Sequence, residues 1–258
     1  MKKVFMFVPG FGQIVSATTF LTTHALHQAL ASKSIGAAVS TLSFPDIAEL
    51  RSMAFTIWLD SMKDTDYLLF IDSDMGFQPE MVLDMILFDE PIVGAIYPQR
   101  KVPTSWAGSG TGSMQTERRG NFMLVEGVGM GCTLIRRDAA EQMVAKMPHL
   151  IDNRLDLHPA VGIMRSAGCN RLIRAFEKLD LPERGIVSED LSFCIRWNQC
   201  GGKVWAAIGY KISHVGPYDY AACYLEHVTA QQQLAQQQVA QGEPIPLPMP
   251  EPQLQAAE

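Results

Sequence analysis

The sequence predicts an α/β fold in which a mostly parallel central sheet carries helices on both faces. Through residues 1–98, short apolar runs alternate with longer segments of helical periodicity. The apolar runs lack polar alternation, which is typical of strands buried on both faces. The chain has 258 residues, of which 47% are hydrophobic, so one large domain can bury a full core.

The first half of the chain supplies strands and helices in turn. The strands that we expect span Val4–Val8, Ile35–Leu42, Tyr67–Ile71 and Ile92–Ile96. The helices between them span Ser16–Ala31, Ile47–Ser61 and Pro79–Phe88, the last with proline in its first turn, where it is favoured. The first strand breaks at Pro9-Gly10-Phe11-Gly12, a turn that leaves room for close backbone approach.

After Tyr97 the pattern changes, and we expect a small antiparallel region in the C-terminal half. Gly108–Gly112 is a Gly/Ser-rich loop, and Leu124–Arg136 is predicted as a strand with glycines at 127, 129 and 131. Alternating glycines let a ligand or another backbone come close, so Gly129 is a candidate binding position. Further helices are predicted over Asp138–Lys146, near Asn170–Lys178 and over Leu191–Gln199, and further strands over Lys203–Ala207 and Tyr210–His214.

Composition restricts the possible classes of protein. The net charge of −6 argues against a general nucleic-acid binder, although a nucleic-acid acceptor is not excluded. The five cysteines are odd in number and show no C-x-x-C spacing, which favours a reducing, cytoplasmic location over a disulfide scaffold or structural zinc. We expect no signal peptide and no membrane span. Residues 228–258 form a Gln/Pro-rich tail, disordered or weakly helical over Gln231–Gln241.

Two carboxylates follow the most apolar run of the chain. Asp72 and Asp74 flank Ser73 directly after Tyr67–Ile71, and side chains at i and i+2 of an extended chain leave on the same side. Ligands of open α/β sheets bind at the carboxyl ends of strands. Converging carboxylates favour a hard cation such as Mg²⁺ or Mn²⁺, completed by substrate phosphates. A helix-capping turn before Pro79 is the competing interpretation.

A second acidic pair and a late histidine complete the candidate site. Ser188-Glu189-Asp190 precedes a predicted helix, for which Ser188 is a plausible cap, and His214 ends a short strand. Asp190 is the candidate general base for an attacking hydroxyl, with Glu189 beside it. His214 is a candidate metal ligand. Taken alone, the two acids fit a helix N-terminus and the histidine fits a strand end.

The order of these motifs resembles a known family. The D-x-D strand, Ser188–Trp197, Gly201–Trp205 and His214-Val215-Gly216 together look like GT-A glycosyltransferases, in particular family-2-like enzymes of bacteria and phages, over about residues 4 to 220. The resemblance implies a GT-A (Rossmann-like) domain at 1–227, in which 1–98 bind the nucleotide and 99–227 carry the acceptor side and catalysis.

The resemblance also implies an activity: Mn²⁺- or Mg²⁺-dependent transfer of a sugar from a nucleotide-sugar donor, a UDP-sugar being favoured, to an unidentified hydroxyl acceptor. Asp190 would be the base of an inverting reaction. Metal binding falls to Asp72, Asp74 and His214, and donor binding to Pro9, Gly10, Gly12, Arg51, Asp72, Ser73 and Gly129. One departure leaves the nucleobase open, because Ser40–Ser43 ends the second strand without the acid that many members carry there.

Two alternatives remain at this stage. A nucleotidyltransferase that acts on a sugar phosphate uses a similar sheet, although residues 9–16 lack the Lys or Arg that its phosphate loop usually contains. A non-catalytic nucleotide-sugar-binding protein is the other. The oligomeric state cannot be read from the sequence.

Overall fold

The computed structural model describes residues 1–10, 12, 14–108 and 117–240, and it confirms the α/β class. The central sheet has eight strands in the order β2-β1-β3-β10-β5-β15-β9-β8. These are β2 (Gly36–Leu42), β1 (Lys3–Pro9), β3 (Tyr67–Ile71), β10 (Cys132–Arg136), β5 (Ile92–Ala95), β15 (Val204–Ala207), β9 (Phe122–Val125) and β8 (Arg118–Arg119).

Most of the principal strands run in the same direction. Strand β1 pairs in parallel with β2 and β3, and β5 pairs in parallel with β15. Between these groups lies β10, antiparallel to both β3 and β5. The carboxyl ends of β1, β3, β5 and β15 therefore meet at one edge of the sheet, together with the amino end of β10.

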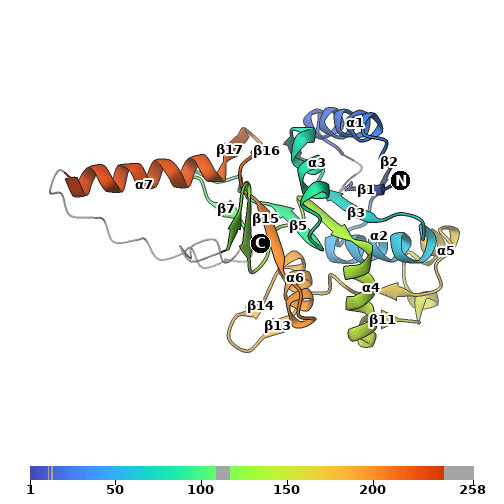
Figure 1. The fold of residues 1–258 in the computed structure, drawn as a ribbon. Helices are drawn as coiled ribbons and strands as arrows, with labels where there is room; N and C mark the ends of the chain where they lie inside the picture. The colour runs from blue at the N-terminus through green and yellow to red at the C-terminus, as the bar shows by residue number, and fades with distance from the viewer. Residues whose placement is uncertain (11, 13, 109–116, 241–258) are drawn as a thin grey trace.

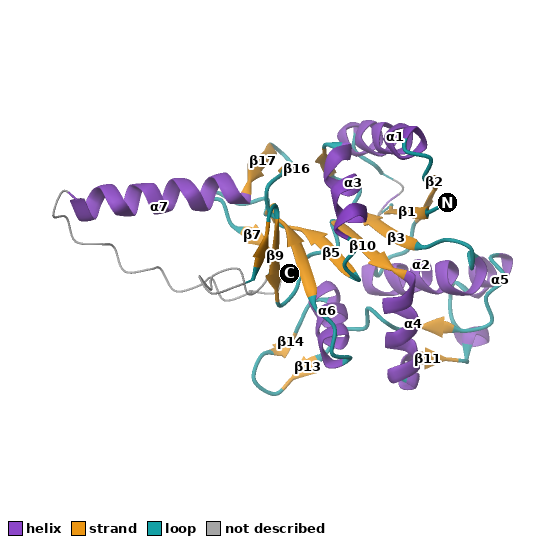
Figure 2. Cartoon of the chain, in the orientation of Figure 1, coloured by secondary structure: helices purple, strands orange, loops and turns teal. Residues whose placement is uncertain are grey.

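Helices cover both faces of the sheet, as predicted (Figures 1 and 2). Side chains of α1 (Ala17–Ser32) and α3 (Pro79–Phe88) pack in one apolar cluster with one face of the strands. Side chains of α2 (Ile47–Ser61), α4 (Arg137–Lys146) and α6 (Glu189–Gln199) pack against the other face. Every residue of β3 is buried, which agrees with its uninterrupted apolar sequence.

Local sequence signals fix several of these boundaries. Ser16 and Asp46 are the N-caps of α1 and α2, and their side chains accept hydrogen bonds from the backbone N–H groups of Thr19 and Glu49. Pro79 begins α3, where its missing N–H costs nothing. The predicted bounds of α2, β3 and α3 are confirmed.

Smaller antiparallel sheets lie mainly in the C-terminal half, as expected. One combines β4 (Met75–Phe77), β16 (Lys211–Val215) and β17 (Asp219–Cys223). Pairs form between β11 (Ile151–Asp152) and β12 (Leu172–Ile173), β13 (Asp180–Leu181) and β14 (Gly185–Ile186), and β6 (Tyr97–Pro98) and β7 (Trp106–Ala107). Short helical turns, η2 (Pro148–Leu150), η3 (Leu155–Leu157) and α5 (Val161–Ser166), connect this region.

Two predicted elements are wrong. Leu124–Arg136 is not one strand: β9 ends at Val125, a turn follows, and β10 begins at Cys132 elsewhere in the sheet. The glycines belong to that turn. Asn170–Lys178 is not helical but holds β12 and a turn. The last core helix begins at Glu189, two residues before the predicted start.

The segment before the chain end is more helical than expected. Helix α7 (Tyr224–Ala240) projects from the body of the molecule (Figure 1). Residues 241–258 of the predicted Gln/Pro-rich tail and most of the 108–112 loop lie outside the described residues. No helix among the described residues combines the length and apolar character needed to cross a membrane.

The predicted division of the chain at residues 98 and 227 stays a prediction. Strands from both proposed halves share the central sheet.

Candidate active site

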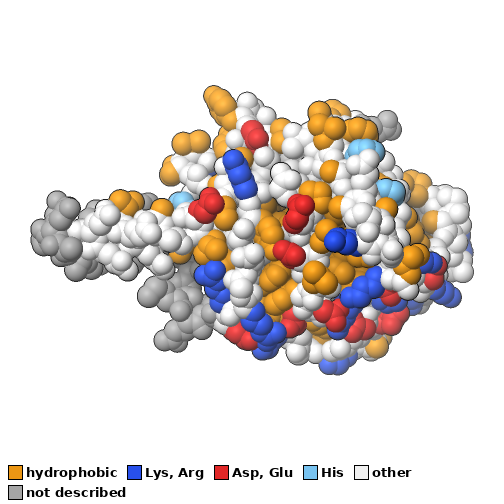
Figure 3. Space-filling view, turned by 45° about the horizontal axis from the view of Figure 1, so that its top comes forward, with side chains coloured by type: hydrophobic (Ala, Val, Ile, Leu, Met, Phe, Trp, Pro, Cys, Tyr) orange, Lys and Arg blue, Asp and Glu red, His pale blue; other side chains and the backbone are white. Residues whose placement is uncertain are grey.

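Most of the predicted site residues lie at the carboxyl edge of the parallel strands. Pro9 ends β1, and Gly10 follows it, with its N–H donating to Leu42 at the end of β2 (2.9 Å). The Asp72–Asp74 segment leaves β3 at the same edge, where the N–H of Asp72 donates to Gly131 (2.9 Å). The space-filling view shows acidic side chains among hydrophobic ones near the centre of the side of the molecule that it draws (Figure 3).

An aromatic cluster holds the supporting elements at fixed distances. Phe55 of α2 contacts Phe176 and Phe193 edge-on, with ring centroids 6.0 Å and 5.9 Å away. Phe176 also meets Phe70 of β3 at 5.4 Å and stacks on Phe193 of α6 at 4.5 Å. This packing joins the helix that carries Arg51, the strand that precedes Asp72 and the helix that begins at Glu189.

Arg51 is the bridge between the two acidic motifs. Its side chain is 4% exposed, and its Nη2 donates to Asp72 Oδ1 at 2.7 Å while its Nη1 donates to Glu189 Oε1. Burial opposes the positive charge, but the carboxylates of Asp72, Glu189 and Asp190 outweigh it and raise the pKa of Arg51. The D-x-D strand and the S-E-D helix therefore converge, as predicted, through one buried guanidinium.

Glu189 and Asp190 open α6 and differ in their surroundings. Burial raises the pKa of Glu189 against the opposing charge of Arg51. Asp190 Oδ1 accepts from the N–H of Leu191 (2.7 Å) and from the hydroxyl of Ser188. Ser188 occupies the N-cap position as predicted, but its side chain makes no capping bond and instead orients Asp190. Glu189 thus pairs with Arg51, whereas the hydrogen bonds of Asp190 come from Ser188 and Leu191.

Asp74 faces a histidine and a second arginine. Its Oδ2 lies 3.4 Å from His214 Nε2 and 3.2 Å from Arg100 Nη1. Burial works against ionisation of this carboxyl, but His214 and Arg100 overcome it and hold the pKa of Asp74 below its usual value. The backbone carbonyl of Asp74 also accepts from Val215 (2.7 Å), which fastens β16 beside the D-x-D turn.

The donor atoms at Asp74 and His214 fit a divalent cation. His214 Nδ1 lies 2.9 Å from the carbonyl oxygen of Pro98, which only accepts, so Nδ1 carries the proton. Nε2 is then the ring nitrogen that faces the Asp74 carboxylate, and if a metal ion replaced its proton, the Nε2 lone pair and the carboxylate oxygen would both be directed at that ion. The part of the chain that the structure describes holds no group of three or more His, Cys, Asp or Glu side chains suited to a metal. Two protein ligands are sufficient for Mg²⁺ or Mn²⁺, whose remaining positions go to water and phosphate. Asp72, predicted as a third ligand, is bound by Arg51.

Tyr97 fills the space that the turn glycines leave. A Cβ atom at Gly129 would lie 2.3 Å from its hydroxyl oxygen, and one at Gly131 would lie 2.7 Å from its Cζ. The Gly131 N–H donates to the Tyr97 hydroxyl (3.3 Å), and the ring meets His214 edge-on at 5.4 Å. The close approach predicted at Gly129 is therefore made by a side chain of this protein, and its role in donor binding stays a prediction.

Tyr97 and Arg100 lie in the site although no sequence motif pointed to them. Both follow β5, a predicted strand whose carboxyl end had to lie at the site edge. The carboxyl ends of all parallel strands lie at the site edge, so this topology was the signal that could have identified both residues.

The last two predicted positions are Gly12 and Ser73. Gly12, with φ of +62°, follows β1, and its neighbours 11 and 13 lie outside the described residues. Ser73 contributes its carbonyl, which accepts from the N–H of Ser16 (2.8 Å).

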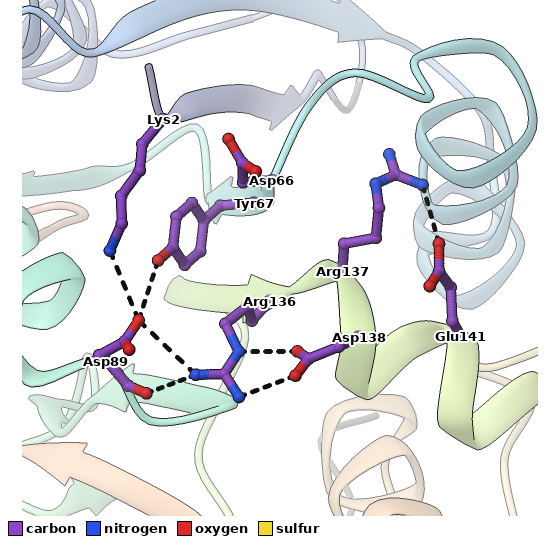
Figure 4. A pocket seen from close by; sticks show the side chains of 8 residues that line it. All are labelled: Lys2, Asp66, Tyr67, Asp89, Arg136, Arg137, Asp138 and Glu141. Atoms are coloured by element: carbon purple, nitrogen blue, oxygen red, sulfur yellow. Dashed lines mark hydrogen bonds and ion pairs between the residues drawn. The ribbon is translucent and has the colours of Figure 1, made fainter.

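Two cavities lie away from these residues. One of about 450 Å³ sits at the opposite edge of the sheet, where Tyr67 begins β3 and Arg136 ends β10 (Figure 4). Its charges pair within the cavity, Arg136 with Asp138 and Arg137 with Glu141. Phe44 and His158 are among the residues that line another cavity of about 360 Å³, where Arg174 pairs with Glu49. Neither cavity contains a residue predicted from the sequence to bind the donor or the metal.

Comparisons with known proteins give distant structural likenesses. No family model matches this sequence, and no curated protein matches it. A197 from STIV is 18% identical, with a TM-score of 0.49, over 87% of this chain and 91% of that one. A mutant of Drosophila β1,4-galactosyltransferase 7, in complex with manganese, UDP-Gal and xylobiose, is 14% identical, with a TM-score of 0.45, over 90% and 80%. Mannose-1-phosphate geranyltransferase from Thermus thermophilus is 12% identical, with a TM-score of 0.45, over 83% and 76%. At these TM-scores the likenesses carry no inference about the activity of this chain.

Proposed function

We propose that this protein is a metal-dependent glycosyltransferase that moves a sugar from a nucleotide-sugar donor to a hydroxyl acceptor. The observation that carries the proposal is the convergence of three motifs at one sheet edge. Arg51 joins Asp72 to Glu189 beside Asp190, and Asp74 faces His214. Clustered carboxylates can hold a metal ion, and that ion attracts the negatively charged diphosphate of a nucleotide-sugar donor.

Each residue has a distinct role in this proposal. Asp74 and His214 hold Mn²⁺ or Mg²⁺, and Asp72, oriented by Arg51, faces the donor. When bound, the ion neutralises the negative charge of the departing nucleoside diphosphate. Pro9, Gly10, Gly12 and Ser73 form the turns that approach the nucleotide, for which UDP is the first candidate. The assignment to family-2-like enzymes stays a prediction.

The chemical step is a displacement at the anomeric carbon. The acceptor hydroxyl oxygen bonds to that carbon, the bond from carbon to the diphosphate oxygen breaks, and the hydroxyl proton passes to the Asp190 carboxylate. Attack opposite the leaving group inverts the anomeric centre. Ser188 and the N–H of Leu191 bind one oxygen of Asp190 and thereby orient the other.

Product analysis tests the proposal. We expect wild-type protein with Mn²⁺ and a nucleotide-sugar panel to release a nucleoside diphosphate, by hydrolysis or by transfer to an added acceptor. Release of pyrophosphate from a nucleoside triphosphate and a sugar phosphate would instead indicate a nucleotidyltransferase. Asp190→Asn should cut turnover roughly 10²-fold or more while donor affinity stays unchanged. Equal turnover in this variant would contradict the role of Asp190.

A further inference from the structure

The segment from Tyr97 to Arg100 surrounds the candidate metal ligands. The Pro98 carbonyl accepts from His214 Nδ1, and the Tyr97 ring packs against the same histidine. Arg100 extends to Asp74 and places Nη1 3.2 Å from Oδ2. Its side chain is 49% exposed, in contrast to the 4% of Arg51, so Arg100 has solvent into which it can move.

The glycine of the H-x-G motif makes room for this arginine. A Cβ atom at Gly216 would lie 2.8 Å from Arg100 Cδ and 3.4 Å from Arg100 Cγ. The aliphatic part of Arg100 therefore passes directly over Gly216. Because Gly216 does not have a left-handed φ, it is the space above it, rather than the backbone, that requires glycine.

Arg100 and a divalent cation would compete for the same atom. Asp74 Oδ2 is the oxygen nearest both to His214 Nε2 and to Arg100 Nη1. A cation held by Oδ2 and Nε2 would lie next to the guanidinium, and two positive charges at such separation repel. The donor's diphosphate, in contrast, offers oxygens that a guanidinium binds strongly.

We propose that Arg100 neutralises Asp74 in the metal-free protein and exchanges this partner for the donor's diphosphate when the cation binds. This inference rests on the proposed function. It predicts that Arg100 weakens the binding of the metal alone and strengthens the binding of nucleotide in the presence of metal. A residue with a merely structural role would weaken both or neither.

Arg100→Gln tests the exchange through two opposite effects. Mn²⁺ affinity of the full chain without nucleotide, measured by the electron paramagnetic resonance of free Mn²⁺, should rise roughly two- to fivefold, the worth of a half-exposed ion pair. The affinity for UDP or GDP at saturating Mn²⁺, measured by calorimetry, should fall about tenfold. Arg165→Gln, which removes an exposed arginine paired with Asp156, is the matched control and should change neither affinity.

Gly216→Ala moves the same charge without removing it. The added methyl group displaces Arg100 from Asp74, so Mn²⁺ affinity should again rise, whereas UDP affinity should fall less than in Arg100→Gln. If both variants bind Mn²⁺ with an affinity equal to or lower than that of wild type, the inference about Arg100 is overturned, but the assignment of Asp74 and His214 as metal ligands is not. If wild-type protein and Asp74→Asn bind Mn²⁺ equally, both the inference and the proposed function fail.

Discussion

Replacement of Arg51 by methionine is the sharpest structural perturbation of the site. Methionine keeps much of the volume but leaves Asp72 and Glu189 without their shared cation. Their side chains are 26% and 13% exposed, so neither carboxylate is fully solvated. Breaking a buried pair costs about 3–5 kcal/mol in general, and partial exposure brings the expected loss of unfolding free energy here to about 3 kcal/mol.

The measurement is urea denaturation followed by tryptophan fluorescence. Trp58 lies on α2 with Arg51 and is fully buried, so its share of the emission from the four tryptophans changes when this helix unfolds. Arg51→Met should lower the urea concentration at the midpoint of unfolding and leave the m-value unchanged. Adding Glu189→Gln to this variant removes one of the stranded charges and should restore about 1 kcal/mol or more. Arg165→Met, at an exposed position of α5, should behave like wild type.

Two results would refute this reasoning. Arg51→Met within about 0.5 kcal/mol of wild type would mean that the guanidinium does not stabilise the two acids. A double variant that is no more stable than Arg51→Met would mean that Glu189 does not carry the unpaired charge.

Further predictions concern pH, packing and capping. The pKa of Glu189 is raised above its ordinary 4.5, so the folded protein retains this proton to higher pH than the unfolded chain does. The stability of wild type relative to Glu189→Gln should therefore fall as the pH rises from about 4 through the raised pKa. Denaturation at a series of pH values measures this difference, and a pH-independent difference would be inconsistent with the burial of Glu189. Gly131→Ala would bring a methyl group within 2.7–2.9 Å of the Tyr97 ring and hydroxyl and should cost about 1–3 kcal/mol by calorimetric melting, whereas Gly162→Ala, with open space around it, should not; equal melting temperatures would contradict the packing. Asp46→Ala should destabilise the protein by about 1 kcal/mol in urea through loss of the α2 cap, without changing Mn²⁺ affinity; a change in that affinity would place Asp46 in the site.

The sequence predicted best those elements whose signals are local. The apolar run Tyr67–Ile71 ends at a carboxylate, and Pro79 marks the first turn of α3, so both elements have the predicted bounds. Asp46 caps α2 in the same way. These signals depend on neighbours within a few residues, which the sequence displays directly.

The failures came from interactions between distant residues. Gly129 and Gly131 were predicted as strand positions because nothing in the sequence indicates that Tyr97 packs over them. Residues Leu172–Ile173 form a strand only because Ile151–Asp152 lie beside them. The short β4 likewise exists through its pairing with β16.

The site was predicted as a set of motifs, but its internal pairing was not. Converging acids after β3 and before α6 were expected, and Arg51 joins them. The sequence could not show that Arg51 engages Asp72 while Asp74 turns to His214, because the choice depends on how α2 and β16 pack. Arg100 belongs to a segment without regular periodicity and gave no motif of its own.

A thermal-shift panel of nucleotide sugars, with and without Mn²⁺, tests the central claim most directly. We predict that at least one nucleoside-diphosphate sugar raises the melting temperature only when Mn²⁺ is present, and that Asp74→Asn abolishes this shift. A panel without any shift, or an undiminished shift in Asp74→Asn, would contradict the assignment of this sheet edge to a metal-bound donor.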